Sequence, residues 1–325
     1  MKKIKYLIVI PFFLLLFSCD QNEEQNLEKV GLLLPYPIDD QAWNAKGYQG
    51  MLKLQSTLGV DVLLKEDIRS KSLVEDAIAE FHKEDVGIVF GHSHIYADLF
   101  MGLKDDFPDM HFISFNGEVE GDNITSLHFE GYAMGYFAGM LAAEMTDSNE
   151  VGVIAAFPFQ PEVKGFEDGA KFHSDSVTVN IDYVESWVDK SRAFRIFNEM
   201  KNKDVDIFYP AGDGYHVEII EKVKKEGLYA IGYVGDQLDL GESTVLTSTV
   251  QEVEKLYEFV ATDFKEGKLE SGNIYFDFED GVITMGNFSE EVPSKTREWI
   301  EDHITKYIES GMLPDDVKNN AEGDE

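Results

Sequence analysis

The sequence predicts an α/β fold with two doubly wound lobes, each built on a mainly parallel sheet. Short apolar runs, typical of buried strands, alternate with helical segments of about 10–15 residues, which is the pattern of βαβ units. The pattern occurs in two successive blocks, and 325 residues correspond to about two domains of ~150 residues each. With 43% hydrophobic residues, the chain can bury a substantial core in each lobe.

Residues 1–18 have the features of a secretory signal peptide. Three lysines precede an apolar run from Tyr6 to Phe17, which is shorter than the ~20 residues of a membrane-spanning helix. The Leu-Phe-Ser-Cys sequence that ends at Cys19 resembles the bacterial lipoprotein box, which implies that Cys19 is lipidated. The alternative is an ordinary signal peptide with a chance cysteine. We expect residues 19–28 to form a polar tether.

The charge excludes several classes of partner. The chain has 62 acidic and 28 basic residues, a net charge of −34, and cleavage after residue 18 would leave 25 basic residues and a charge of −37. Such a surface repels nucleic acids and anionic membranes, and it suits an exported protein. A saline or alkaline habitat is one hypothesis for the acidic excess. A single cysteine excludes an internal disulfide and the usual multi-cysteine zinc sites.

The first block begins with the apolar run 29–34, which ends at Pro35. The strands expected in this block are 29–34, 60–64, 86–91, 110–115 and 124–129, and the helices are 41–58, 71–83 and 131–145. The helix 131–145 is rich in glycine and alanine, so we expect its backbone to pack closely against a sheet.

The second block repeats the alternation. Its expected strands are 150–156, 177–183, 205–210, 229–233 and 245–250, and its expected helices are 163–173, 189–201, 215–225 and 251–265. Two further strands, 274–278 and 282–285, flank a Glu-Asp-Gly turn and predict a hairpin. A last helix is expected at 294–310, with Ser294 as its N-cap and Gly311 as its C-cap.

The sequence contains no common catalytic motif. It has no GxSxG, HExxH or GxxxxGK[ST] pattern, so it predicts neither an enzyme nor a cofactor. Gly212-Asp213-Gly214 is a weak dinucleotide signal whose alternative is a plain strand-to-helix turn. His92 and His94 follow a strand and could share a metal, but no third ligand is evident, and we predict no metal site.

Aromatic and polar residues gather where predicted strands end. Trp43 lies in the first such loop, and Trp187, Asp213 and Asp236 lie in loops of the second block. Ligands of open α/β sheets bind at the carboxyl ends of the strands, so facing loops would form a cleft for a flat ligand. For Trp43 alone, packing of a helix end is the alternative.

An ordered set of motifs resembles the basic membrane lipoprotein family, also called PnrA-like, the substrate-binding lipoproteins of nucleoside ABC importers. The motifs are DDQAWN, EGYAMGYFAGMLAA, GFEDGAK, PAGDG, IGYVGDQ and LTSTV, and the likeness covers roughly residues 28–290. The resemblance implies a type I periplasmic-binding-protein fold with a hinge and an interlobe cleft. It implies an N-terminal lobe of 29–127 with about 249–272 and a C-terminal lobe of 128–248 with about 273–312. From their composition, we expect residues 313–325 to form an acidic tail.

The resemblance also implies site residues. Asp40, Trp43 and Asn44 match the first-loop motif, and Trp187 matches a second stacking aromatic residue. Three positions depart from the family pattern, because Asn116 and Val234 replace aspartates and Gln251 replaces a lysine. The full candidate ligand-binding set is Asp40, Trp43, Asn44, His92, Asn116, Trp187, Gly212, Asp213, Gly214, Asp236 and Gln251.

Three functions are compatible with these observations. The first is a lipid-anchored, extracytoplasmic protein that binds a nucleoside-like or purine-like ligand for an ABC permease or for sensing. The second follows from LPYPIDDQAWNAKGYQG and GYVGDQ, which resemble the Med-type branch of indirect positive regulators of competence genes. The third, a cleft enzyme, is supported only by the permissiveness of the fold. None of the three involves direct nucleic-acid binding.

Overall fold

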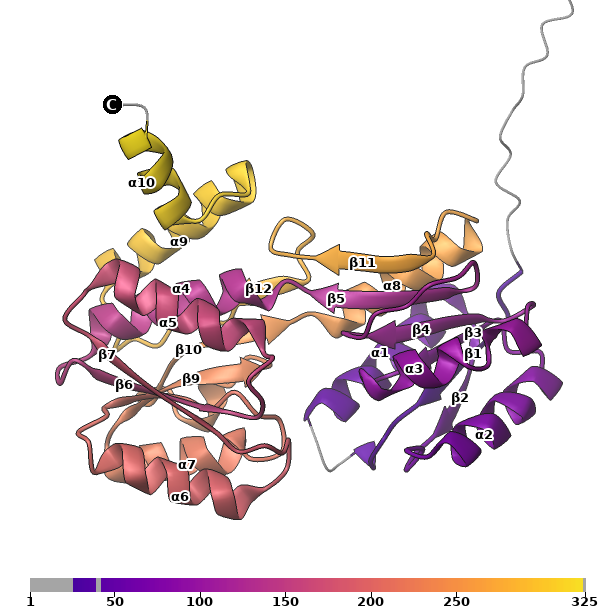
Figure 1. The fold of residues 1–325 in the computed structure, drawn as a ribbon, viewed down its shortest axis with the longest axis horizontal. Helices are drawn as coiled ribbons and strands as arrows, with labels where there is room; N and C mark the ends of the chain where they lie inside the picture. Colours follow the sequence, from indigo (N-terminus) through magenta and orange to yellow (C-terminus); the bar gives the residue numbers. More distant parts are fainter. Residues whose placement is uncertain (1–25, 39–41, 324–325) are drawn as a thin grey trace, which may run out of the picture.

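The computed structural model describes residues 26–38 and 42–323 as two α/β lobes lying side by side (Figure 1). The signal peptide, Cys19, most of the tether and Asp40 lie outside the described residues. Each lobe contains one six-stranded sheet with helices on both faces. The predicted fold class is therefore confirmed.

The sheet of the first lobe is parallel throughout. Its strands lie in the order β11-β5-β4-β3-β1-β2. The strands are β1 (Lys29–Leu33), β2 (Asp61–Lys65), β3 (Ile88–Gly91), β4 (His111–Phe115), β5 (Ile124–Phe129) and β11 (Gly272–Phe276). The helices are α1 (Ala42–Leu58), α2 (Lys71–Lys83), α3 (Ile95–Met101) and α8 (Val253–Lys265). Helices α1 and α8 share one hydrophobic core, and α2 and α3 contribute to another.

The second lobe has the sheet order β12-β10-β9-β8-β6-β7, with only β12 antiparallel to its neighbour. The strands are β6 (Glu150–Ala155), β7 (Thr178–Tyr183), β8 (Ile207–Tyr209), β9 (Tyr229–Val234), β10 (Val245–Gln251) and β12 (Ile283–Met285). The helices are α4 (Gly131–Met145), α5 (Pro161–His173), α6 (Lys190–Lys201), α7 (His216–Glu226), α9 (Ser294–Ser310) and α10 (Pro314–Gly323).

Three segments cross between the lobes, after β5, after β10 and between β11 and β12. The third crossing follows Phe276, whereas the sequence-based boundary stood near residue 272. The prediction of a hairpin at 274–285 is also wrong. Strand β11 pairs with β5 of the first lobe and β12 pairs with β10 of the second, so the turn residues belong to an interlobe connection.

Helix α4 packs against helix α5, not only against the sheet. A Cβ atom at Gly139 would lie 2.0 Å from the carbonyl oxygen of Phe166, and one at Gly169 would lie 1.9 Å from that of Tyr136. Glycines on both helices therefore let the two backbones touch. The sequence correctly indicated close backbone packing, but the partner is a neighbouring helix.

The chain end also differs from expectation. Pro293 occupies the N-cap of α9, so Ser294 is the first helical residue, whereas Gly311 ends the helix in the left-handed conformation as predicted (φ 67°). The region expected as an acidic tail contains helix α10, which begins at Pro314 with Asp315 and Asp316 in its first turn. Proline at the first position and acidic residues in the first turn favour a helix start, which explains the difference.

Candidate functional site

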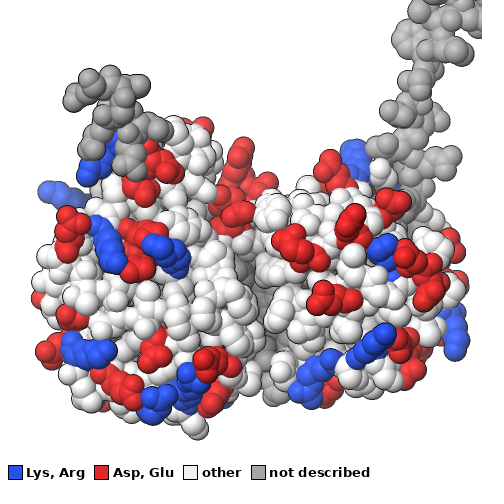
Figure 2. Space-filling view, viewed as in Figure 1, with Lys and Arg blue, Asp and Glu red and all other residues white. Residues whose placement is uncertain are grey.

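A cavity of about 870 Å³ lies between the two lobes. The space-filling view shows a furrow between them (Figure 2). Its described lining comes from both lobes and from the crossing segment after β5: Pro35, Tyr36, Trp43, Arg69, Ser93, His94, Ile95, Asn116, His128, Phe129, Glu130, Gly131, Phe159, Gln160, Pro161, Glu162, Trp187, Asp213, Tyr233, Val234, Gln251 and Tyr275.

Trp43 is fixed in the cavity wall by its neighbours. It stands in the first turn of α1, and its indole stacks on His92 with ring centroids 4.3 Å apart and an interplanar angle of 11°. The edges of Phe115 and Phe129 pack around it, and its Nε1 donates to the carbonyl oxygen of His92 at 3.1 Å. One face of the indole is therefore covered by protein, and the remainder borders the cavity.

His92 lies behind Trp43 and is absent from the described lining. Its Nε2 donates to the carbonyl oxygen of Trp43 at 2.7 Å, so its Nδ1, 2.8 Å from the hydroxyl of Tyr257, accepts a hydrogen bond. Burial lowers the pKa of His92 to about 3, more than its hydrogen bond to Trp43 raises it. His92, predicted to contact the ligand, therefore does not line the cavity, and this neutral histidine positions Trp43.

His94, by contrast, borders the cavity, with its ring centroid 6.2 Å from that of Phe159 of the other lobe. Burial lowers its pKa. No cluster of three or more metal-ligating side chains occurs within residues 26–38 and 42–323.

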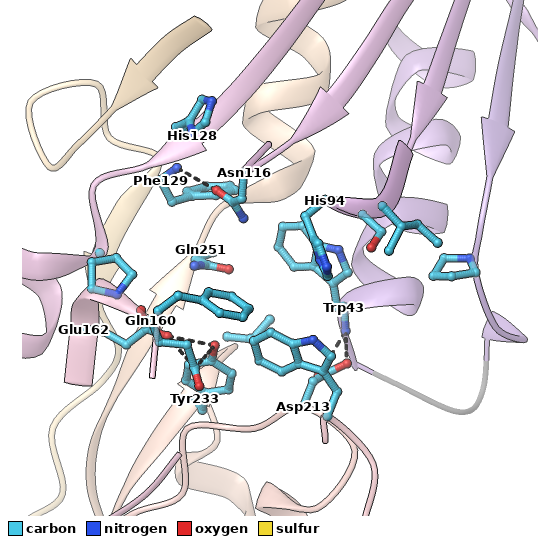
Figure 3. A pocket seen from close by; sticks show the side chains of 18 of the residues that line it. Trp43, His94, Asn116, His128, Phe129, Gln160, Glu162, Asp213, Tyr233 and Gln251 are labelled. Atoms are coloured by element: carbon cyan, nitrogen blue, oxygen red, sulfur yellow. Dashed lines mark hydrogen bonds between the residues drawn. The ribbon is translucent and has the colours of Figure 1, made fainter. Parts of the chain in front are cut away.

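Asp213 of the second lobe meets the first turn of α1 in the first lobe (Figure 3). The backbone N–H of Trp43 donates to its two carboxylate oxygens, at 3.2 and 3.1 Å. Burial raises the pKa of Asp213 to about 7, although hydrogen bonds from the backbone of Trp43 and Ala42 act in the opposite direction. The carboxylate thus caps a helix across the lobe boundary.

The two glycines that flank Asp213 are absent from the described lining. A Cβ atom at Gly212 would lie 2.0 Å from the Tyr215 ring, and one at Gly214 would lie 2.9 Å from the carbonyl oxygen of Trp187. The N–H of Gly214 also donates to that carbonyl at 2.8 Å. The structure therefore gives these glycines a packing role that places Asp213 and Trp187.

Trp187 borders the cavity from the loop that precedes α6. Its ring is edge-on to Phe157, at a centroid distance of 5.3 Å. Trp43 and Trp187 therefore bring one indole from each lobe to the same cavity.

The three positions that depart from the family pattern, Asn116, Val234 and Gln251, also line the cavity. Asn116 follows β4 in the left-handed conformation (φ 53°), and its Oδ1 accepts from the N–H of Phe129 at 3.3 Å, which leaves its Nδ2 on the other side (Figure 3). Val234 ends β9 with φ 69°, a conformation rarely adopted by a β-branched residue. Gln251 ends β10, with only 9% of its surface exposed.

A network that sequence reasoning missed borders the cavity in the second lobe. Gln160 Nε2 donates to Glu162 Oε1 at 2.9 Å and lies 3.2 Å from the Tyr233 hydroxyl, which itself donates to Glu162 Oε1 at 3.0 Å (Figure 3). Glu162 stands in the first turn of α5, directly after Pro161. The Gln-Pro-Glu sequence at the carboxyl end of a predicted strand was the signal that could have indicated it.

Two other candidates are structural, and Asp40 lies outside the described residues. The buried Asn44 donates to the carbonyl oxygens of Tyr36 and Pro37, at 3.0 and 3.1 Å, and so shapes the first loop. Asp236 accepts from the backbone and side-chain nitrogens of Asn287, at 3.0 and 2.6 Å. Neither lines the cavity, because these hydrogen bonds hold both side chains elsewhere.

Comparisons with known proteins follow this geometry. A family model described as "ABC transporter substrate-binding protein PnrA-like" matches residues 27–316. A relative from Bacillus subtilis (strain 168), named transcriptional activator protein med, is 46% identical over 311 residues, covering 95% of this chain and 98% of the relative. A purine-binding protein from Brucella abortus (strain 2308) is 25% identical over 290 residues, covering 88% and 82%.

Solved structures give the same fold. The crystal structure of a transcriptional activator of the comK gene from Bacillus halodurans has a TM-score of 0.83 at 52% identity, covering 88% of this chain and 99% of the other. A solute-binding protein of an ABC transporter system from Aeropyrum pernix K1 has a TM-score of 0.72 at 18% identity, covering 88% and 81%. The second likeness extends to the fold alone.

Proposed function

Because this chain belongs to the PnrA-like family of ABC transporter substrate-binding proteins, we propose that its interlobe cavity binds a small, flat solute. The observation that carries the proposal is the pair Trp43 and Trp187, which border one cavity from opposite lobes. A volume of about 870 Å³ falls within the range of ~300–1,000 Å³ that is usual for small-molecule sites. We assign the cavity a binding role and no catalytic step, in keeping with the family's description.

A nucleoside-like or purine-like solute is the first candidate ligand. The name of the Brucella relative supports a purine, and aromatic side chains suit a flat ring. Val234, however, offers no acceptor to a sugar hydroxyl, and a hydrogen bond to a charged group contributes ~1.5–3 kcal/mol. If two such bonds to sugar hydroxyls are lost, nucleoside binding weakens by on the order of 10²–10⁴-fold. We therefore propose a specificity shifted away from ordinary nucleosides.

A regulatory output is the second candidate function. The predicted likeness to the Med-type branch is confirmed by 46% identity to a protein named as a transcriptional activator. We propose that any effect on transcription is indirect, because 62 acidic residues against 28 basic ones oppose contact with DNA. Permease and ATPase genes beside the gene for this chain would favour import over regulation.

We further propose attachment to the outer face of the cell membrane through a lipid on Cys19. Within the described ranges, no helix is both long and apolar enough to cross a membrane. The change Cys19→Ser should move the full-length chain from the membrane fraction to the soluble fraction. Retention of the variant in the membrane fraction would contradict lipid anchoring.

A thermal-shift screen of nucleosides, free bases and other flat metabolites tests the binding proposal. A ligand at 100 times its dissociation constant stabilises the native state by ~2.7 kcal/mol, which is easily detected. We expect at least one flat solute to raise the melting temperature. A panel that leaves it unchanged would contradict ligand binding and favour a regulator that has lost its ligand.

A further inference from the structure

The charged side chains of the cavity wall are unbalanced. Glu162 and Asp213 are both buried there, with 5% and 6% of their surfaces exposed. Arg69 is the only lysine or arginine among the described lining residues, and it is exposed at the rim. Its guanidinium lies 3.5 Å from the carboxylate of Asp67 and 4.7 Å above the Tyr36 ring, so it is already engaged.

His94, which also lines the cavity, does not restore the balance. Burial lowers the pKa of His94, which makes the cation less favourable at neutral pH. Asp213 is at least engaged by the backbone of α1, as described above. Glu162 is the other buried lining carboxylate, and no lysine, arginine or histidine of the described residues forms an ion pair with it.

Only one oxygen of Glu162 is satisfied by other side chains. Oε1 receives hydrogen bonds from Gln160 and Tyr233, whereas no other side chain of the described residues donates to Oε2. Gly131 borders Oε2, and a Cβ atom there would lie only 3.2 Å from it, so the glycine lets the start of α4 pack closely against this oxygen. Burial raises the pKa of Glu162, although hydrogen bonds from its own backbone N–H, from Gln160 and from Tyr233 act in the opposite direction.

Aromatic side chains line the same cavity as this carboxylate. Tyr233 donates to it, and Trp43, Trp187, Phe129 and Phe159 line the same cavity. The π-faces of aromatic rings attract cations, with the strongest effect where water is excluded. A buried carboxylate together with tryptophan and phenylalanine rings is a combination suited to a positively charged aromatic ligand.

We propose that the cavity selects a flat organic cation, whose charge pairs with Glu162 Oε2 and whose ring packs against the aromatic side chains of the wall. This inference rests on the proposed solute-binding function and narrows its ligand class. The excess of acidic over basic residues, 62 against 28, would also raise the local concentration of cations around the cleft. Glu162 thereby becomes the residue that determines specificity for charge.

Matched pairs of probes test the inference by isothermal titration. 1-Methylnicotinamide, methylated on its ring nitrogen, is a cation with the ring of neutral nicotinamide, and 1-methyladenosine is the cationic counterpart of adenosine. For at least one pair, we expect the cation to bind the wild-type chain at least ~10-fold more tightly than its neutral partner. In Glu162→Gln, which keeps an acceptor for Tyr233 and Gln160, the preference should fall below ~3-fold.

Glu167→Gln is the matched control, because it removes one negative charge from the same helix, α5, outside the described cavity lining. It should keep the full preference for the cation. If Glu162→Gln does not fold, the ratio of cation to neutral-partner affinity in the wild-type chain and in Glu167→Gln still decides whether the cavity prefers a cation.

The outcomes separate the two proposals. Equal or tighter binding of the neutral partners would overturn the cation inference and leave the solute-binding function standing. An unchanged preference in Glu162→Gln would remove Glu162 from the account of specificity and overturn the inference as well. Absence of binding by all four probes, together with a flat thermal-shift screen, would contradict the solute-binding function itself.

Discussion

At the residue scale, a few side chains that do not reach the cavity decide how those that do are held. His92 supports Trp43 by stacking, accepts a hydrogen bond from Tyr257 and donates one to the Trp43 backbone, so the tryptophan is placed before any ligand arrives. Such preorganisation lowers the entropic cost of binding. The sequence indicated both His92 and Trp43, but it could not tell which of the two lines the cavity.

Val234 offers a test of specificity at a single position. Aspartate and asparagine adopt positive φ more readily than valine, so Val234→Asp should be accommodated by the backbone at φ 69°. The new carboxylate could accept a hydrogen bond from a sugar hydroxyl, and we expect nucleoside affinity to rise by ~10-fold or more, as measured by titration calorimetry with adenosine.

Val234→Asn is the control for that substitution. It has a similar shape but no charge, so it should give a smaller gain. Weaker binding of adenosine by Val234→Asp than by the wild-type chain would show that this position does not face the sugar.

Asp213 predicts a dependence of stability on pH. Its pKa of about 7 in the folded chain stands above the ordinary value of 3.8, so folding takes up a proton between these values. Its contribution is therefore fully present below about pH 4 and is lost as pH rises through 7, a change of up to ~4 kcal/mol. Compared with Asp213→Asn in chemical denaturation, the wild-type chain should gain stability as pH falls from 7.5 to 4.5.

The comparison with Asp213→Asn is needed because buried histidines act in the opposite direction. Burial lowers the pKa of His92 to about 3 and of His216 to about 4, so both destabilise the fold as pH falls. Asp175→Asn, at an exposed turn, serves as the control and should follow the wild-type curve. A difference between wild type and Asp213→Asn that is constant with pH would rule out the proton uptake.

At the element scale, the contact between α4 and α5 depends on the absence of side chains. In Gly139→Ala, the new methyl group would lie 2.0 Å from the Phe166 carbonyl oxygen and 2.9 Å from the Ala170 nitrogen, which only a shift of a helix could relieve. We expect a loss of roughly 3 kcal/mol or more in the free energy of unfolding, measured in urea.

Gly102→Ala is the matched control for the helix contact. The nearest atom to its Cβ would be a carbonyl oxygen at an ordinary 3.5 Å, and the residue is exposed, so the change should stay within ~0.5 kcal/mol. Similar costs at the two positions would contradict direct backbone contact between the helices.

Predictions of elements are correct where the local sequence pattern determines the structure. They are wrong where a strand's partner lies far away in the sequence. The helix at 294–310 and its left-handed end at Gly311 follow from periodicity and a glycine cap. The two strands around residue 280 have a good hairpin turn, yet each completes a different sheet because open sheet edges in both lobes compete for them. Turn chemistry is local, and sheet-edge pairing is a property of the whole fold.

At the scale of the whole molecule, charge and topology act together. Figure 2 shows acidic side chains over both lobes with fewer basic ones among them. The sequence predicted two lobes and several cavity residues, since strand ends of parallel sheets converge. It could not place Tyr233 in the buried network with Gln160 and Glu162, because that contact is made by packing across more than 70 residues.

A net charge of −34 predicts that salt stabilises this chain. Sodium chloride screens repulsion between exposed carboxylates, so the melting temperature should rise between 10 mM and 0.5 M salt. A gain of 1 kcal/mol corresponds to ~2–4 °C for a domain of this size. The rise should be smaller at pH 4.5, where some carboxylates are protonated, and a fall in melting temperature with salt would contradict this reading.

The central claim is that a solute is held between indoles from the two lobes, and titration calorimetry with the tightest ligand from the thermal-shift screen tests it most directly. Trp43→Ala and Trp187→Ala should each weaken binding by at least ~10-fold, because each removes one aromatic wall of the cavity. Trp299→Ala, in helix α9 outside the described lining, should bind like the wild-type chain. Wild-type affinity in both Trp43→Ala and Trp187→Ala would contradict the claim.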